Sequence, residues 1–184
     1  MEGKKELIMF KTIDIVQIGL MAAVIYIVTF AINIPYYTGV IHLGDSMVFI
    51  SAILLGSKKA AVASAIGMCL FDLLSPYAIW APFTFVIKGI MALIAASIAY
   101  RRNYNGNSFW NNVFAFTVAS IWMIVGYYLG GIILYHYYFK LNWMKSYILP
   151  LNDVAGNIVQ VLCGMAIALS LGTAIKKSIG NKLL

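Results

Sequence analysis

The sequence is poor in charge. Only 10% of its 184 residues are Asp, Glu, Lys or Arg, whereas 62% are hydrophobic and the mean hydropathy is +0.89. A soluble domain carries about 25% charged residues. The shortage therefore excludes a soluble globular protein and leaves no stretch long enough for a soluble catalytic domain. We expect an all-α integral membrane protein, with residues 1–184 forming a single membrane domain.

Cysteine and catalytic signatures are also scarce. The two cysteines, Cys69 and Cys163, lie in separate apolar runs, so we interpret both as packing residues rather than a disulfide or a metal site. The sequence contains no glycine-rich phosphate loop, no His-Glu-x-x-His and no nucleophile elbow. We therefore expect no metal, no cofactor and no ATP hydrolysis by this chain itself.

Long apolar runs are plentiful, and short polar or proline-containing segments separate them. A membrane span needs about 20 apolar residues, and fewer where protein covers the helix. Six helices are expected at approximately residues 12–33, 45–56, 60–74, 83–100, 110–136 and 151–176. This topology forms one compact six-helix bundle with both termini on the same side.

The cations predict the orientation of that bundle. Ten of the thirteen fall on one face of the topology: Lys4, Lys5, Lys11, Lys58, Lys59, Arg101, Arg102, Lys176, Lys177 and Lys182. Lys and Arg are concentrated in cytoplasmic loops of membrane proteins. Both termini are therefore expected to be cytoplasmic, and topology explains the pI of 9.4 without nucleic-acid binding.

One segment, residues 72–88, joins charge, aromatic rings and two prolines between apolar runs. A charge within a membrane span costs about 2.5–3.5 kcal/mol on insertion scales, so it usually faces a cavity or a partner. Asp72 and Lys88 are therefore candidate site residues. Trp80 lies between the two prolines, and we expect its indole to stack on a flat ring.

Other polar residues fall in the same outer half of the predicted bundle. Thr84 lies one turn from Lys88, and residues 153, 157 and 160 follow i, i+4 and i+7, which places them on one helix face. The candidate binding residues are Asp72, Trp80, Thr84, Lys88, Tyr128, Asp153, Asn157 and Gln160. Either they line a ligand pocket open to the outside, or Lys88 pairs with Asp72 or Asp153 and the cluster only holds the helices together.

Small residues mark the first predicted helix. Gly19, Ala22 and Ala23 would let another helix approach its backbone closely in lipid. That helix belongs either to the same bundle or to a partner membrane subunit.

Several short motifs occur between residues 42 and 89. They are His42-Leu-Gly-Asp45, Ala52-Ile-Leu-Leu-Gly56, Ala65-Ile-Gly67, Phe71-Asp72-Leu-Leu and Ala81-Pro-Phe-Thr-Phe-Val-Ile-Lys88-Gly89. In this order they resemble the substrate-binding S components of energy-coupling factor (ECF) transporters. The resemblance implies six helices, a vitamin pocket near the outer face and a place in the plasma membrane of a prokaryote. It also implies partners, namely a transmembrane coupling subunit that would contact Gly19, Ala22 and Ala23, and two cytoplasmic ATPase subunits that bind ATP and Mg.

Within that family the chain looks most like members assigned to pyridoxine or to the hydroxymethylpyrimidine precursor of thiamine. Riboflavin-binding S components are the alternative. The resemblance implies that Asp72 and Asn157 bond the ring or its hydroxyl groups, that Lys88 bonds a ring oxygen or orients Asp72, and that Trp80 stacks on the ring.

Two other classes of function stay open from the residues alone. A small integral membrane enzyme would use Asp72, Asp153 and His136 as acid and base, which requires a buried carboxylate pair with different pKa values. A membrane assembly subunit would use the polar cluster only as internal hydrogen bonding.

Overall fold

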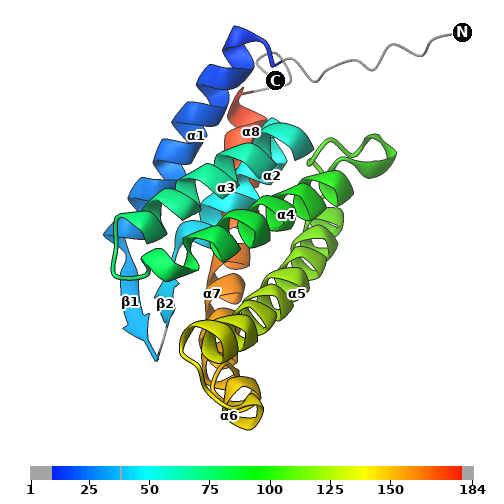
Figure 1. Ribbon diagram of the computed structural model, residues 1–184. Helices are drawn as coiled ribbons and strands as arrows, with labels where there is room; N and C mark the ends of the chain where they lie inside the picture. Colours follow the sequence, from blue (N-terminus) through cyan, green and yellow to red (C-terminus); the bar gives the residue numbers. More distant parts are fainter. Residues whose placement is uncertain (1–9, 38, 180–184) are drawn as a thin grey trace, which may run out of the picture.

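The computed structural model describes residues 10–37 and 39–179 and shows a helical bundle with a small β-hairpin at one end (Figure 1). The helices of the bundle are α1 (Thr12–Ala31), α2 (Gly44–Leu55), α3 (Ser57–Leu73), α4 (Ala81–Ala99), α5 (Phe109–Ile133), α6 (Trp143–Ile148), α7 (Leu151–Ile167) and α8 (Thr173–Ile179). The strands are β1 (Asn33–Tyr36) and β2 (Gly39–His42). Short 3-10 turns at Ala78–Trp80 and Arg101–Asn103 flank α4, and π-helical turns at Leu134–Tyr138 and Ala168–Gly172 follow α5 and α7.

The six predicted helices correspond to α1, α2, α3, α4, α5 and α7, with shifted ends. The predicted helices at residues 45–56 and 60–74 left residues 57–59 as a connection, which is wrong because α3 already begins at Ser57. Gly56 alone makes the corner between α2 and α3, with φ of +74°, a conformation that residues with a Cβ atom rarely adopt. Consequently Lys58 and Lys59 lie in the first turn of α3 rather than in a loop.

The β-hairpin is absent from the predicted topology. The first helix was expected to reach residue 33, but α1 ends at Ala31, where the Asn33 side chain donates to the Phe30 carbonyl at 2.6 Å. The chain then turns back on itself, and Asn33 pairs with His42 across an antiparallel ladder. The hairpin carries the chain from the end of α1 into α2.

Helix α2 is the centre of the bundle. Ten of its twelve residues are buried, and α1, α3, α4 and α7 all pack against it. A helix that is apolar on every side is stable only when other elements cover it on every side. Its few polar side chains pair internally, as Ser51 does with Ser64 of α3 at 3.2 Å. This central helix fixes the positions of the residues at its first turn.

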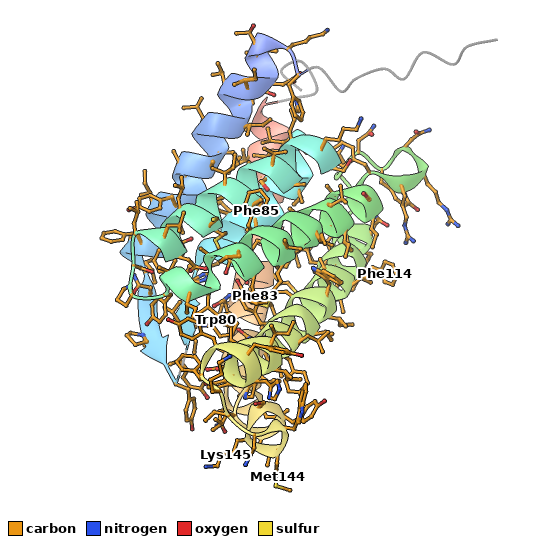
Figure 2. All side chains as sticks on the ribbon, viewed as in Figure 1. Trp80, Phe83, Phe85, Phe114, Met144 and Lys145 are labelled. Carbon is orange, nitrogen blue, oxygen red and sulfur yellow. The ribbon has the colours of Figure 1, made fainter. Side chains whose placement is uncertain are left out.

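Four helical segments are long and apolar enough to cross a membrane: Thr12–Ala31, Ala78–Ala99, Phe109–Tyr138 and Trp143–Lys176. Helix α2 is a shorter apolar helix. Large apolar side chains such as Phe85 and Phe114 are exposed on the outside of the bundle (Figure 2). These features confirm an all-α membrane protein apart from the hairpin, while six complete crossings stay a prediction.

Three basic segments, at residues 58–59, 101–102 and 176, lie at the end of the bundle where α1 begins and α8 ends (Figure 1), whereas Lys145 lies at the opposite end (Figure 2). Lys59 bridges α3 to α1 through Asp14, with 3.2 Å between the charged atoms. Lys176 is buried, and its ammonium group donates to Asn105 O, to the Ile53 carbonyl at 2.7 Å and to the Tyr100 hydroxyl at 3.0 Å.

Lys176 was counted among the cations that predict the orientation, and the structure shows that it also caps the carboxyl end of α2. Lysines interact favourably with the partial negative charge of a helix C-terminus. Lys4, Lys5 and Lys182, and the side chain of Lys177, lie outside the described residues. The side of the membrane on which this end lies therefore stays a prediction.

The small residues of α1 face two directions. Ala22 is buried, and a Cβ atom on Gly67 of α3 would lie only 2.6 Å from the Ala22 carbonyl oxygen. Gly19 and Ala23 are exposed one turn apart, and a Cβ atom on Gly19 would meet nothing within 4 Å. The prediction that all three residues face a partner therefore needs correction, since Ala22 packs inside the bundle. Only Gly19 and Ala23 are available to a partner subunit.

We expect Gly67→Leu to separate α1 from α3 and to lower the free energy of unfolding by about 1–3 kcal/mol, the usual cost of overpacking. Thermal unfolding in detergent micelles measures this loss. Gly19→Leu is the matched control, because it places the same side chain on the open face of α1. Equal melting temperatures for the two variants would contradict this close packing.

Candidate functional site

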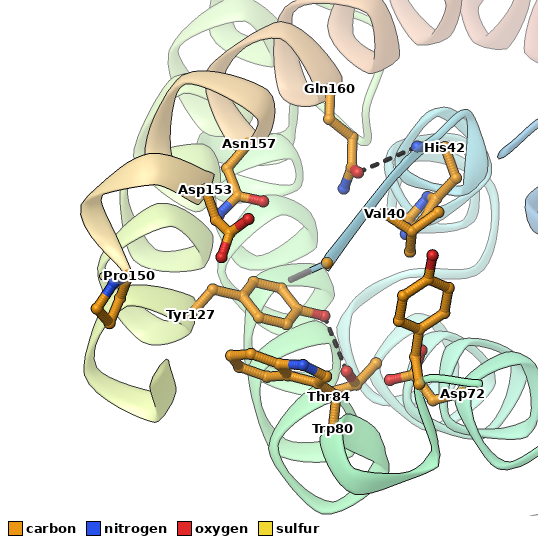
Figure 3. Close-up of a pocket in the computed structure, with 12 residues that line it drawn as sticks. Val40, His42, Asp72, Trp80, Thr84, Tyr127, Pro150, Asp153, Asn157 and Gln160 are labelled. Carbon is orange, nitrogen blue, oxygen red and sulfur yellow. Dashed lines mark hydrogen bonds between the residues drawn. The ribbon is translucent and has the colours of Figure 1, made fainter. Parts of the chain in front are cut away.

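A cavity of about 540 Å³, counted with its open mouth, lies between the hairpin and the adjacent ends of α3, α4, α5 and α7 (Figure 3). Its lining residues are Gly39, Val40, His42, Asp72, Tyr77, Trp80, Thr84, Tyr127, Pro150, Asp153, Asn157 and Gln160. Small-molecule pockets combine apolar walls with a few placed polar groups. The cavity fits this description.

Six of the eight predicted binding residues line the cavity: Asp72, Trp80, Thr84, Asp153, Asn157 and Gln160. The stripe predicted from the i, i+4 and i+7 spacing on α7 forms one wall. The segment from the end of α3 to the start of α4 forms the opposite wall. Lys88 and Tyr128 do not line the cavity.

Trp80 ends the 3-10 turn that precedes α4, and Pro82 holds the first turn of that helix. Its ring lies 5.9 Å from the Tyr127 ring and 6.2 Å from the Phe83 ring, measured between centroids. These neighbours hold the indole in place while it lines the cavity (Figure 3). A flat ligand can therefore stack on it.

Asp72 supplies a buried acceptor to the same cavity. It lies in the last turn of α3 and is 6% exposed, and its Oδ2 atom has no hydrogen-bond partner among the described residues. Beside it, the Thr84 and Tyr127 hydroxyls hydrogen-bond each other at 3.0 Å. Buried polar atoms almost always have partners because an unsatisfied one costs about 1–3 kcal/mol. A donor from a ligand would satisfy Oδ2.

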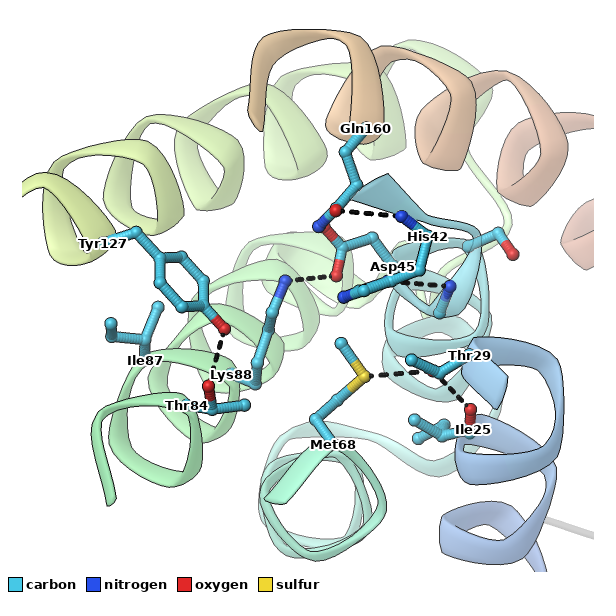
Figure 4. Close-up of polar contacts among 12 residues, drawn as sticks. Ile25, Thr29, His42, Asp45, Met68, Thr84, Ile87, Lys88, Tyr127 and Gln160 are labelled. Atoms are coloured by element: carbon cyan, nitrogen blue, oxygen red, sulfur yellow. Dashed lines mark hydrogen bonds and ion pairs between the residues drawn. The ribbon is translucent and has the colours of Figure 1, made fainter. Parts of the chain in front are cut away.

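Lys88 pairs with a different residue from those considered in the sequence analysis. It is 0% exposed and forms an ion pair and hydrogen bond with Asp45, at the first turn of α2 (Figure 4). The alternative in which Lys88 pairs with Asp72 or Asp153 is thus wrong, and Lys88, which was predicted as a binding residue, does not line the pocket. Sequence analysis named Asp45 only within the motif His42-Leu-Gly-Asp45.

Gln160 connects this ion pair to the pocket. Its Nε2 group donates to Asp45 Oδ2 at 2.7 Å, and its Oε1 atom accepts from the His42 backbone N–H at 3.2 Å. Because a carboxylate only accepts and a backbone N–H only donates, these two contacts fix the amide orientation. One N–H of Gln160 and one oxygen lone pair remain for other contacts.

The family model described as ECF-type riboflavin transporter, S component, matches residues 9–177. The chain belongs to this family. A protein of Pyrococcus woesei, named as an uncharacterized protein in a gap 3' region, is 31% identical over 153 residues, which covers 81% of this chain and 90% of that protein. This chain is therefore a transporter subunit rather than an enzyme.

The enzyme alternative also finds no support in the geometry of this S component. Asp72 and Asp153 line the pocket, but His136 lies elsewhere, stacked on Trp143 with 3.7 Å between ring centroids. The His136 Nδ1 atom hydrogen-bonds the Leu141 carbonyl at 3.0 Å. The three proposed acid and base groups therefore do not form one site.

Tyr127, rather than its neighbour Tyr128, is the tyrosine that α5 contributes to the pocket of this S component. Tyr128 turns away, and its hydroxyl donates to the Tyr147 carbonyl at 3.3 Å. Successive residues of an α-helix point about 100° apart, at 3.6 residues per turn. Sequence reasoning placed both tyrosines in the outer half of the bundle and chose the wrong one, because it could not fix the rotation of α5.

His42 is a lining residue that sequence reasoning missed. It ends β2, and its Nδ1 atom accepts from the Gly44 backbone N–H at 3.2 Å. Burial is the main reason that its pKa falls from 6.5 to about 4, although the charge of Asp45 opposes this shift. The imidazole is therefore neutral at pH 7. The feature of the sequence that could have identified His42 is the motif His-Leu-Gly-Asp, in which His42 lies three residues before Asp45.

We expect the S component to lose stability as the pH falls from about 6.5 to about 4. Over this range the unfolded His42 gains a proton that the folded residue resists, so protonation favours unfolding. A shift of this size corresponds to a loss on the order of 2–3 kcal/mol. Thermal unfolding of wild type and His42→Gln from pH 7 to pH 4 measures it. An equally steep decline in both proteins would contradict the assignment to His42.

Proposed function

We propose that this S component captures riboflavin from outside the cell for uptake by an ECF-type importer. The supporting observation is the pocket itself, which sets the Trp80 ring opposite a polar wall of α7 in a member of the riboflavin S component family. The isoalloxazine ring is flat and aromatic, which suits stacking, and its ribityl chain carries hydroxyl groups that carboxylates and amides can bind.

The proposal includes the partners that such an importer needs. This chain would bind a transmembrane coupling subunit through the exposed side of α1, at Gly19 and Ala23. Two cytoplasmic ATPase subunits would hydrolyse ATP with Mg. The chain would cross the plasma membrane six times, with the end that carries Lys59 and Lys176 in the cytoplasm, as the distribution of cations predicts.

A smaller vitamin is the second candidate, either pyridoxine or hydroxymethylpyrimidine. The observation in its favour is the combination of a single tryptophan with the unsatisfied Asp72 carboxylate oxygen. Pyridoxine and hydroxymethylpyrimidine each carry hydroxyl and ring-nitrogen groups on one small ring, and a pocket with one stacking residue can enclose such a ring.

Ligand titration of the purified full chain tests the proposal. We expect saturable quenching of riboflavin fluorescence, with affinity in the nanomolar to low micromolar range. Pyridoxine and hydroxymethylpyrimidine are titrated separately, and quenching of the tryptophan fluorescence of the protein reports their binding without riboflavin. Binding of either small vitamin without riboflavin binding would show that the small vitamin, rather than riboflavin, is the substrate. Binding of none of the three would refute the proposed function.

A further inference from the structure

Three polar side chains that are almost completely buried lie in a row beside the pocket (Figure 4). Lys88 of α4 pairs with Asp45 of α2, and the Asp45 carboxylate accepts a hydrogen bond from the Gln160 amide of α7. Lys88 and Asp45 are both 0% exposed, and Gln160 is 2% exposed. Of these three residues, only Gln160 lines the cavity. The ion pair therefore reaches the pocket through a single amide group.

The packing of α7 against α2 brings Gln160 to the ion pair. Gly164 lies one turn further along α7 on the same face as Gln160. A Cβ atom on Gly164 would lie only 3.1 Å from the Asp45 Cβ atom, so the absence of a side chain lets the two helices approach closely at this point. The contact between Gln160 and Asp45 is thus built into the way that the helices pack.

Stability alone does not account for a buried ion pair at this position. Taking two charges out of water carries a large desolvation penalty, and well-packed apolar residues of similar volume often stabilise a protein equally well or better. The pair does, however, determine the orientation of a side chain in the binding site. We therefore looked for its role in ligand binding rather than in the fold.

The two ends of the Gln160 amide differ in chemistry, because one end donates hydrogen bonds and the other accepts them. The last torsion of a glutamine side chain has broad, roughly two-fold preferences, so it does not by itself choose between the two orientations. Asp45 Oδ2 accepts from Nε2 at 2.7 Å, and the His42 backbone N–H donates to Oε1 at 3.2 Å. The contact with Asp45 is the shorter one and involves a charged acceptor, which makes it the stronger of the two.

We propose that Asp45 and Lys88 are positioning residues for ligand recognition. Lys88 holds the Asp45 carboxylate, and Asp45 holds the Gln160 amide in the one orientation that the pocket presents to its ligand, while neither residue of the ion pair touches the ligand. A side chain that is already ordered loses less conformational freedom when the ligand binds, and this increases affinity. The inference rests on the proposed function, since it concerns how the same pocket binds riboflavin.

The first test replaces the ion pair by apolar residues of similar size. In the double variant Lys88→Met with Asp45→Leu no charge is left unpaired, so the bundle should still fold. Gln160 loses its acceptor, and riboflavin binding to the purified full chain should weaken about tenfold, as is usual when a residue that orients a direct contact is removed. Quenching of flavin fluorescence measures the affinity. The double variant Lys88→Met with Asp45→Asn keeps an acceptor for Gln160 and should weaken binding less.

A double-mutant cycle separates positioning from a general effect on the fold. Both double variants are measured again together with Gln160→Met, which removes the amide. We expect no further loss of affinity in this background, because the ion pair acts on the ligand only through Gln160. Equal weakening with and without the Gln160 amide would show that the pair only stabilises the bundle, and would overturn the inference.

The double variant Ser51→Ala with Ser64→Ala is the matched control. It removes another buried polar pair between α2 and a neighbouring helix, with 3.2 Å between the two hydroxyl oxygens, and neither serine lines the pocket. It should bind riboflavin as the wild type does.

Two alternatives keep the test decisive. If the variant with Asp45→Leu does not fold, the variant with Asp45→Asn is carried through the cycle instead. If Gln160→Met binds riboflavin too weakly to measure, the difference in affinity between the Asp45→Leu and Asp45→Asn variants decides. Unchanged binding in both ion-pair variants would overturn the inference and leave the proposed function intact. Absence of riboflavin binding by the wild type would overturn both.

Discussion

Lys88→Met is expected to lower the free energy of unfolding by about 3–5 kcal/mol, which is typical when one partner of a buried ion pair is removed. Both side chains are 0% exposed, so neither water nor lipid headgroups can replace the lost ammonium group. Asp45 would be left with Gln160 as its remaining partner. Denaturant or thermal unfolding in micelles measures the loss, and weakened riboflavin binding should accompany it because Asp45 holds Gln160.

Two controls separate charge from packing in this experiment. Lys145→Met removes an exposed lysine and should leave stability within about 0.5 kcal/mol of the wild type. In the double variant Lys88→Met with Asp45→Asn, no unpaired charge remains, while the Asn oxygen can still accept from Gln160. It should recover much of the lost stability. A single variant as stable as the wild type would show that the pair does not support the fold.

The sequence predicted where the helices lie along the chain, but not how each helix is rotated about its own axis. Apolar runs and polar breaks were sufficient to place α1, α2, α3, α4, α5 and α7, because each run must be covered by lipid or by other helices. The partner of Lys88 could not be chosen in this way. Asp45, Asp72 and Asp153 all begin or end helices in the same half of the bundle, and only the packing of α2 against α4 brings Asp45 to the lysine.

The pocket was predicted best where the pattern was periodic within a single helix. Spacing along α7 is enough to place Asp153, Asn157 and Gln160 on one wall, since helical geometry determines their common face. His42 comes instead from a strand four residues long, in a segment that looked like a loop. The position of such a short strand depends on the partner strand and on side-chain packing. One example of this packing is Tyr36, which fills the space beside Gly156.

Trp80→Ala is expected to weaken riboflavin binding about 10–100-fold. Stacking of a heteroaromatic base on an aromatic side chain is worth about 1–3 kcal/mol, and each 1.4 kcal/mol corresponds to a tenfold change in affinity. Trp80 is the tryptophan that lines the pocket, and Tyr127 and Phe83 hold its ring there. Quenching of riboflavin fluorescence measures the change without relying on the indole that is removed.

The matched control for this variant is Trp110→Ala, at the start of α5, where the side chain is 79% exposed. It removes the same indole and should bind riboflavin as the wild type does. Trp80→Phe keeps an aromatic face and should lose only part of the affinity. If Trp80→Ala bound riboflavin as tightly as Trp110→Ala, stacking on Trp80 would be refuted, and recognition would rest on the polar wall of α7 and on Asp72.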